Sequence, residues 1–152
     1  MIGVQAEPLD AARLLADFSA SAAGAGAIAS FTGLVRSQNE GAAVRGLELD
    51  HHPRLAEQAL AGIAADASAR FDLVDIAIVH RHGALAPGET IVFVAAAAAH
   101  RRAALNAVDY VMDRLKTEIP FWKREQRSDG AHWLEARESD HADRRRWEAD
   151  GR

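Results

Sequence analysis

The order of strand-like and helix-like segments constrains the fold of this chain more than any other feature. Residues 27–33 and 43–50 have the pattern of consecutive strands, as do residues 73–80 and 90–99, and no helical segment separates the members of each pair. Strands that are joined without a helical crossover usually pair in antiparallel fashion. The sequence therefore favours an α+β fold with a largely antiparallel or mixed sheet over a doubly wound parallel sheet.

The remaining segments give this sheet flanking helices and a C-terminal hairpin. Helical periodicity begins at Leu9, at Pro53 and near His100, and Pro120 ends the last of these helices near Thr117. The other predicted elements are a short strand at 2–5, hairpin strands at 121–127 and 132–138 around a turn at 128–130, and a charged tail at 138–152 with the character of a loose helix. We expect a single domain over residues 1–152.

Composition excludes several classes of function. The chain has 152 residues and no cysteine, which rules out disulfides, thiolate metal sites and a cysteine nucleophile. Its formal charge of −4 argues against a nucleic-acid footprint over the whole surface, so an anionic ligand needs a local cationic cluster. The longest apolar run, residues 91–99, is too short to span a bilayer as a helix, and we expect a cytoplasmic protein. Its alanines predict a strand packed closely beneath another element, because alanine is a poor strand former.

The two lysines are the first candidates for chemistry. Among the 18 lysines and arginines of the chain, only Lys116 and Lys123 are lysines. Because Pro120 ends the helix between them, Lys116 falls in the last helical turn and Lys123 on the next strand, so two amines could converge on one pocket. Unlike a guanidinium, a desolvated amine has a tunable pKa. Taken singly, each lysine is more often a solvated surface cation.

Further cations gather at the ends of predicted elements. His100, Arg101 and Arg102 open a helix directly after a buried strand, where first-turn amides bind anions and where cations are unfavourable for the helix itself. Arg36 follows Gly33, whose place in a strand indicates a bulge or a close backbone approach, and Arg36 could grip a phosphate. A capping histidine with outward-facing arginines, and an ordinary edge-strand arginine, stay open as alternatives.

The histidines and aromatic residues have simpler explanations. His51, His52, His80 and His82 lack carboxylate or cysteine partners at metal-ligand spacing, so we expect neither a metal nor another cofactor. Three aromatic residues are predicted to form the core of the hairpin: Phe121, Trp122 and Trp133.

Five stretches of the sequence together resemble the large, catalytic subunit of molybdopterin synthase. The resemblance is collinear from about residue 25 to Trp147. The stretches are FTGLVR (31–36), HRHGALAPGETIVFV (80–94), AHRRAAL (99–105), MDRLKTEIPFWKRE (112–125) and WLEARESD (133–140). The block around the two lysines and the EARESD block are highly specific to this family.

This resemblance implies an α/β-hammerhead-like fold and a sulfurtransferase activity. The family makes molybdopterin, the organic part of the molybdenum cofactor, by installing two sulfurs as a dithiolene on cyclic pyranopterin monophosphate. The sulfur arrives on the C-terminal Gly-Gly thiocarboxylate of a small ubiquitin-like partner. Two large subunits form a homodimer, and one small subunit at each end completes a heterotetramer.

The resemblance also implies roles for individual residues. Lys116 and Lys123 match the catalytic lysines of the family. The substrate-binding positions fall on Leu34, Val35, Arg36, His100, Arg101, Lys116, Lys123, Arg124 and Glu125. His100 and Arg101 are expected to serve the pocket of the neighbouring subunit. Leu34 is expected to contribute only its backbone, because the family can carry a basic residue there.

Two other classes of function stay open on the residues alone. A non-catalytic module that binds an anionic pterin or nucleotide would need the cations but no primary amine, so it would largely survive Lys→Arg at both positions. A phosphoester hydrolase would usually need a metal, for which the sequence offers no convincing set of ligands.

Overall fold

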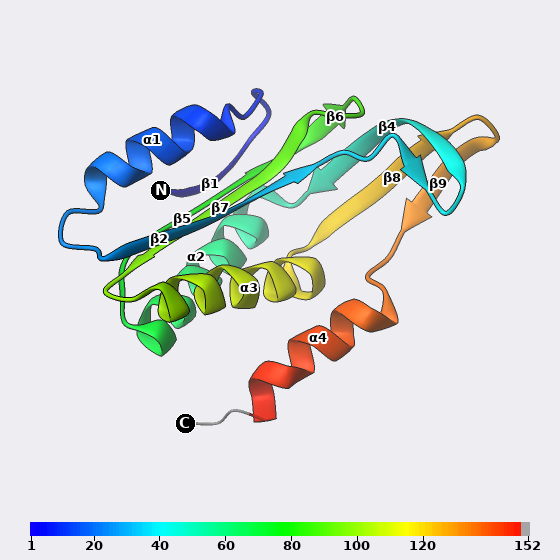
Figure 1. The fold of residues 1–152 in the computed structure, drawn as a ribbon. Coiled ribbons are helices and arrows are strands. Elements are labelled where there is room, and N and C mark those ends of the chain that lie inside the picture. Colours follow the sequence, from blue (N-terminus) through cyan, green and yellow to red (C-terminus); the bar gives the residue numbers. More distant parts are fainter. Residues whose placement is uncertain (150–152) are drawn as a thin grey trace.

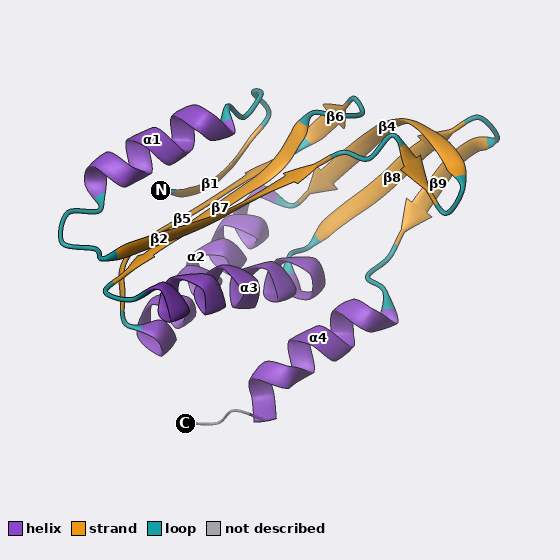
Figure 2. Cartoon of the chain, viewed as in Figure 1, coloured by secondary structure: helices purple, strands orange, loops and turns teal. Residues whose placement is uncertain are grey.

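The structure, a computed structural model, describes residues 1–149 and consists of two sheets with helices packed around them (Figures 1 and 2). Its elements are β1 (Ile2–Gln5), α1 (Ala11–Ser21), β2 (Ala27–Leu34), β3 (Gln38–Asn39), β4 (Ala42–His51), α2 (Pro53–Phe71), β5 (Leu73–Arg81), β6 (Gly83–Leu85), β7 (Thr90–Ala98), α3 (Arg101–Glu118), β8 (Phe121–Arg127), β9 (Gly130–Leu134) and α4 (Glu138–Ala149). The predicted α+β class, with a mixed sheet, flanking helices and a C-terminal hairpin, is confirmed.

The first sheet has the strand order β1-β5-β7-β2 and is covered on both faces. Only the β1–β5 pair is parallel, whereas β7 pairs antiparallel with both β5 and β2. Helices α2 and α3 lie on one face and α1 lies on the other (Figure 1). Strand β2 forms an edge of this sheet, so its outer backbone groups have no strand partner within residues 1–149.

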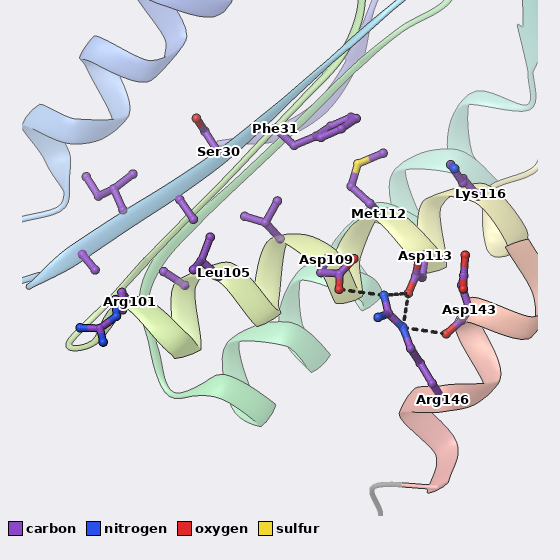
Figure 3. Close-up of a pocket in the computed structure, with 15 residues that line it drawn as sticks. Ser30, Phe31, Arg101, Leu105, Asp109, Met112, Asp113, Lys116, Asp143 and Arg146 are labelled. Carbon is purple, nitrogen blue, oxygen red and sulfur yellow. Dashed lines mark hydrogen bonds and ion pairs between the residues drawn. The ribbon is translucent and has the colours of Figure 1, made fainter.

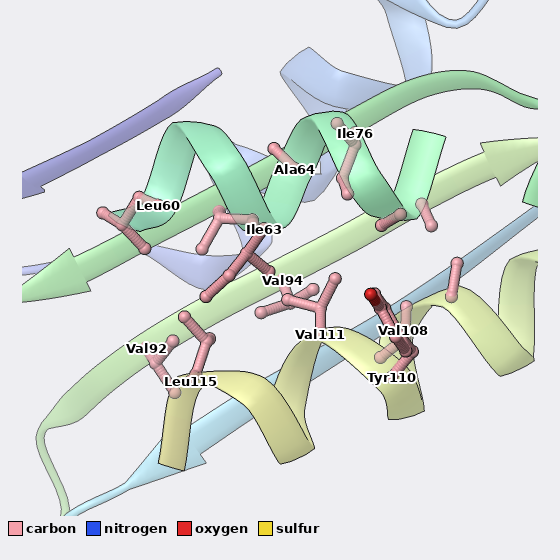
Figure 4. Packing of buried hydrophobic residues seen from close by; sticks show 14 residues of the cluster. Leu60, Ile63, Ala64, Ile76, Val92, Val94, Val108, Tyr110, Val111 and Leu115 are labelled. Carbon is pink, nitrogen blue, oxygen red and sulfur yellow. The ribbon is translucent and has the colours of Figure 1, made fainter. Parts of the chain in front are cut away.

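The alanine run of β7 lies at the centre of the molecule, as its composition predicts. Ala95 and Ala97 pack against α1, and Ala96 packs against the opposite cluster formed with α2 and α3. Figure 4 shows this second cluster, in which Ile63 and Val111 approach the sheet from α2 and α3. Small side chains on both faces of β7 let helices approach closely on either side, and this packing offsets the poor strand propensity of alanine.

The second sheet, β3-β4-β8-β9, is antiparallel and extends beyond the end of the first (Figure 2). Strand β6 pairs with β4 inside the segment 83–89, for which the sequence predicts only a turn. The predicted second hairpin strand, 132–138, instead covers residues 130–134. Both differences arise because short strands are defined by their pairing partners and carry little periodicity of their own.

Helix α4 shows that the predicted tail is docked. Arg146 pairs with Asp109 at 2.8 Å and with Asp113 at 2.7 Å, and the Trp147 indole donates to the same Asp113 carboxylate at 2.7 Å. The Trp147 ring also meets Tyr110 edge-on, with ring centroids 5.4 Å apart. The helix is confirmed for residues 138–149, and these contacts hold it against α3; residues 150–152 of the predicted tail lie outside the described residues.

Candidate active site

The junction of α3 and β8 brings the two lysines to one site. Helix α3 ends at Glu118, Ile119 is extended, and Pro120 leads into β8, so the chain turns sharply between Lys116 and Lys123. The two amines interact electrostatically, and both also interact with the carboxylate of Asp140 at the start of α4. The convergence expected from Pro120 is therefore present in the structure.

Lys123 is partly buried at the centre of the second sheet. In register it lies between Leu49 of β4 and Leu134 of β9, which are both apolar. Burial lowers the pKa of the Lys123 amine; the nearby charge of Asp140 raises it, and that of Lys116 lowers it, so the net shift is downward. An amine in these surroundings loses its proton more readily than an exposed lysine does, as proton transfer requires.

Lys116 is more open and lies at one end of a groove. Its side chain is 51% exposed, and its Nζ lies 3.3 Å from Asp140 Oδ1. The groove, about 660 Å³ in volume, is bounded by β2, α3 and α4 (Figure 3). Phe31, Leu105 and Met112 give it an apolar lining along its length.

Arg101 lies at the other end of the same groove (Figure 3). The fifteen residue-to-residue steps from Arg101 to Lys116 span about 22 Å of helix axis at the rise of an α-helix. His100 precedes the helix, and within residues 1–149 its side chain makes no capping hydrogen bond. Neither His100 nor Arg101 can therefore reach a small ligand held by Lys116 of the same chain.

Strand β2 and helix α3 both run antiparallel to β7, so they run in the same direction. Arg36 follows β2 and therefore lies beyond the end of this strand that is opposite to the Arg101 end of the groove. It is exposed, and its guanidinium makes no ion pair inside the described part of the chain. A register shift occurs at Gly33, where a Cβ would lie 2.7 Å from the Val92 side chain, so the predicted bulge and close approach are both present.

The other two residues of the FTGLVR stretch lie beside Arg36 and differ in exposure. Leu34 is exposed, whereas Val35 is buried and tied by its backbone to the 83–89 segment: its N–H donates to the Glu89 carbonyl at 2.9 Å and its carbonyl accepts from Gly88 N–H at 2.8 Å. The Val35 side chain therefore does not face a ligand.

Arg124 and Glu125 have partners of their own. Arg124 pairs with Glu48 and lies over the Trp133 ring, on the sheet face opposite Lys123. Glu125 is buried, where it pairs with Arg127 at 2.5 Å and accepts a hydrogen bond from Asn39 at 3.1 Å. Glu125 lies on the same sheet face as Lys123, but in this arrangement its side chain joins β8 to β3.

Two of the four histidines singled out in the sequence, His51 and His80, contact Phe121. His80 stacks on Phe121 with ring centroids 4.3 Å apart, and the His51 ring lies 4.5 Å from that of His82. Within residues 1–149, no group of three or more His, Asp or Glu side chains is arranged to hold a metal ion. Burial is the main cause of a pKa of about 4 for His80, so this ring is neutral at physiological pH.

The predicted hairpin core is wrong for two of its three aromatic residues. Phe121 packs against His80 and His51, but Trp122 is 52% exposed and Trp133 is 65% exposed. Strand alternation places Trp122 on the face opposite Lys123, and no element of the described chain covers that face.

Asp140 is the site residue that residue-level reasoning missed. It belongs to the EARESD stretch, whose specificity to the family was a signal of function, but its role depends on where α4 docks.

No helix within residues 1–149 is long and apolar enough to cross a membrane.

Comparisons with known proteins identify the family of this chain. The MoaE protein family profile matches residues 4–118. The molybdopterin synthase catalytic subunit of Pseudomonas aeruginosa is 47% identical over 147 residues, which cover 97% of this chain and 98% of the relative.

Solved structures give the same result. The MoaE protein of Burkholderia ambifaria superimposes with a TM-score of 0.82 at 42% identity, over 97% of this chain and 99% of the other. A Helicobacter pylori complex of subunits 1 and 2 of molybdopterin-converting factor contains a chain with a TM-score of 0.72, at 21% identity and 90% coverage of both chains, which concerns the fold alone. The profile match and the near-complete coverage at over 40% identity show that this chain belongs to the MoaE family of molybdopterin synthase catalytic subunits.

Proposed function

We propose that the Lys116–Lys123 site transfers sulfur from the C-terminal thiocarboxylate of a small partner to cyclic pyranopterin monophosphate. The observation that carries the proposal is the meeting of the only two lysines of the chain, one of them with a lowered pKa, in a protein without cysteine. Such a chain cannot carry the sulfur on its own side chains, so the sulfur must come from a partner. Family membership supports the same reaction.

The proposed chemistry needs proton transfer and charge stabilisation. The thiocarboxylate sulfur attacks a side-chain carbon of the pterin, forming a C–S bond as a C–O bond to the cyclic phosphate breaks. Water then cleaves the resulting thioester, which leaves the sulfur on the pterin and releases the partner's carboxylate. A second thiocarboxylate forms the other C–S bond at the neighbouring side-chain carbon, where an oxygen substituent leaves as water. Hydrolysis of this second thioester again releases the partner's carboxylate, and the phosphate stays on the pterin through its remaining ester bond. Lys116 and Lys123 supply and accept protons and stabilise the developing oxyanions.

Substrate binding is assigned to cations at the two ends of the groove. Arg36 is exposed beyond the end of β2 and free to pair with a phosphate. His100 and Arg101 are proposed to serve the pocket of a second copy, because about 22 Å of helix separates Arg101 from Lys116.

The proposed assembly is a homodimer that binds one small partner at each end. Apolar side chains exposed on β2 and α3 support a second copy on this edge, namely Ile28, Phe31, Leu34 and Leu105. A two-fold axis through the middle of the groove would bring the Arg101 end of one copy to the Lys116 end of the other. The P. aeruginosa relative is a catalytic subunit, and the H. pylori structure is a complex of two different subunits. Both support a small partner for this chain.

The test is reconstitution. Purified chain is mixed with a thiocarboxylated small subunit and cyclic pyranopterin monophosphate, and dithiolene product is measured by mass spectrometry. Product that requires both the chain and the thiocarboxylate supports the proposal, whereas its absence with a folded, partner-bound chain contradicts it. Light scattering of the chain alone should give a dimer at micromolar concentration, and a monomer with and without the partner would contradict the proposed assembly.

A further inference from the structure

Asp140 is held rigidly in the first turn of α4. Its Oδ2 accepts the backbone N–H of Arg137 at 2.9 Å, and its own N–H donates to the Arg137 carbonyl at 2.9 Å. This is the acidic half of a capping box, which also suits the positive end of the helix dipole. The other oxygen, Oδ1, is thereby left to face Lys116 at 3.3 Å.

The two partners in this ion pair differ in mobility. The Asp140 side chain is only 16% exposed and is fixed by the cap, whereas the Lys116 side chain is half exposed and has four rotatable bonds. An exposed ion pair adds little to folding stability. A rigid carboxylate nevertheless determines where the flexible amine rests, which is the requirement for a positioned catalytic group.

The place of Asp140 is set by other residues of α4. Arg144 pairs with Glu118 at 2.7 Å, and Arg146 pairs with Asp113 at 2.7 Å, so both pairs join α4 to α3 further along the helix. Since these contacts hold the helix, the Asp140 carboxylate is not needed for docking and can serve the lysines.

We propose that Asp140 is a positioning residue of the active site, which anchors the Lys116 amine and keeps one negative charge beside both lysines. The inference rests on the proposed function as far as catalysis is concerned. Two charged groups act on Lys123: Lys116 from α3 and Asp140 from α4. His80 of β5 also lies near Lys123, but its ring is neutral at physiological pH. The residues that face it from β4 and β9, Leu49 and Leu134, carry no charge.

This arrangement has a definite electrostatic consequence. Asp140 opposes the downward shift that burial imposes on the pKa of Lys123. Removing its charge should therefore lower the pKa of Lys123 further, whichever protonation state the reaction needs. Any limb of the pH–rate profile that reports Lys123 should move to lower pH.

The experiment compares Asp140→Asn with Glu138→Gln. Asparagine keeps an oxygen for the Arg137 N–H but removes the charge. Glu138 lies in the same helical turn and its side chain is 88% exposed, so Glu138→Gln removes one negative charge at a place that faces solvent. Because the chain has only two lysines, a sample labelled with ¹³C at lysine Cε gives two side-chain signals that can be followed by NMR from neutral to alkaline pH.

The expected result has two parts. In Asp140→Asn the Lys123 signal titrates at lower pH than in the wild type, while Glu138→Gln titrates as the wild type does. Dithiolene turnover falls at least roughly tenfold in Asp140→Asn, as for a misplaced catalytic group, and stays within about twofold in Glu138→Gln.

The outcomes separate this inference from the proposed function. If wild-type protein makes no dithiolene, the proposed function fails, but the lysine titration still tests the electrostatic role of Asp140. An unchanged Lys123 titration in Asp140→Asn overturns the inference. If, in that case, turnover also falls and amide exchange in α4 becomes faster, the result assigns Asp140 to the helix cap alone.

Discussion

Lys116 and Lys123 lie in different surroundings, yet both carry a primary amine. The other 16 of the 18 lysines and arginines in the chain are arginines, which carry a guanidinium group. Lys→Arg keeps the charge but removes the readily released proton and adds bulk. We expect each of Lys116→Arg and Lys123→Arg to lower dithiolene turnover by about 10²-fold or more, the low end of what a positioned acid–base group contributes. Arg45→Lys, an exposed exchange on β4, is the matched control and should have little effect.

Partner binding and folding should be unchanged in both lysine variants, as measured by calorimetry and circular dichroism. Near-normal turnover in both would remove the need for amines. That outcome would favour the module that only binds an anionic pterin or nucleotide.

His80 predicts how folding stability depends on pH. Folded His80 takes up a proton only near pH 4, whereas unfolded His80 does so near 6.5. Between these values the unfolded state binds more protons, so the free energy of unfolding falls as the pH falls. From pH 7 to pH 5 this residue should remove about 2 kcal/mol of stability.

Urea denaturation at pH 7 and pH 5 checks this prediction. The loss of stability between the two pH values should be about 2 kcal/mol smaller in His80→Phe than in the wild type. His52→Gln, a change at an exposed histidine, should keep the wild-type dependence. An equal pH dependence in all three proteins would show that His80 is not the buried neutral group described above.

At the scale of elements, α4 depends on one buried carboxylate. Asp113 accepts hydrogen bonds from both Arg146 and Trp147, whereas Asp109 is half exposed and pairs with Arg146. Asp113→Ala leaves the Trp147 indole without its acceptor and Arg146 with its exposed partner Asp109, so we expect a loss of about 1–3 kcal/mol and faster amide exchange throughout α4. Asp109→Ala should cost less than about 1 kcal/mol, because exposed ion pairs contribute little. Equal exchange rates in the two variants would contradict this account of the docking.

The elements that could be predicted from the sequence are those with local signals. The helix expected over residues 100–117 is α3, Arg101–Glu118, because Pro120 and the apolar stripe determine it locally. Strand β6, the exposure of Trp122 and the docking of α4 depend on partners far away in the chain, and no local periodicity encodes them. The convergence of the lysines followed from Pro120, whereas Asp140 depends on the tertiary position of α4 and could not be assigned.

At the scale of the whole molecule, the length of α3 separates the two groups of cations. Arg101 and Lys116 mark opposite ends of one groove, and β2 forms an edge of the first sheet beside it. Under the proposed function, one chain therefore offers two half-sites about 22 Å apart along the helix axis. The proposed symmetric dimer would let each copy complete the site of the other.

Mixing inactive chains tests that arrangement directly. Arg101→Ala and Lys116→Ala should each abolish most activity as homodimers. When the two variants are co-expressed, the pocket that combines Lys116 of one chain with Arg101 of the other is intact, so about a quarter of wild-type activity should return for random pairing of a two-fold dimer. Lys116→Ala co-expressed with Lys123→Ala is the matched control: both lysines belong to the same pocket of the same chain, so no heterodimer carries an intact site and activity should stay low. Equal activity in the two mixtures would refute the shared pocket, and an Arg101→Ala homodimer of normal activity would show that Arg101 serves neither site.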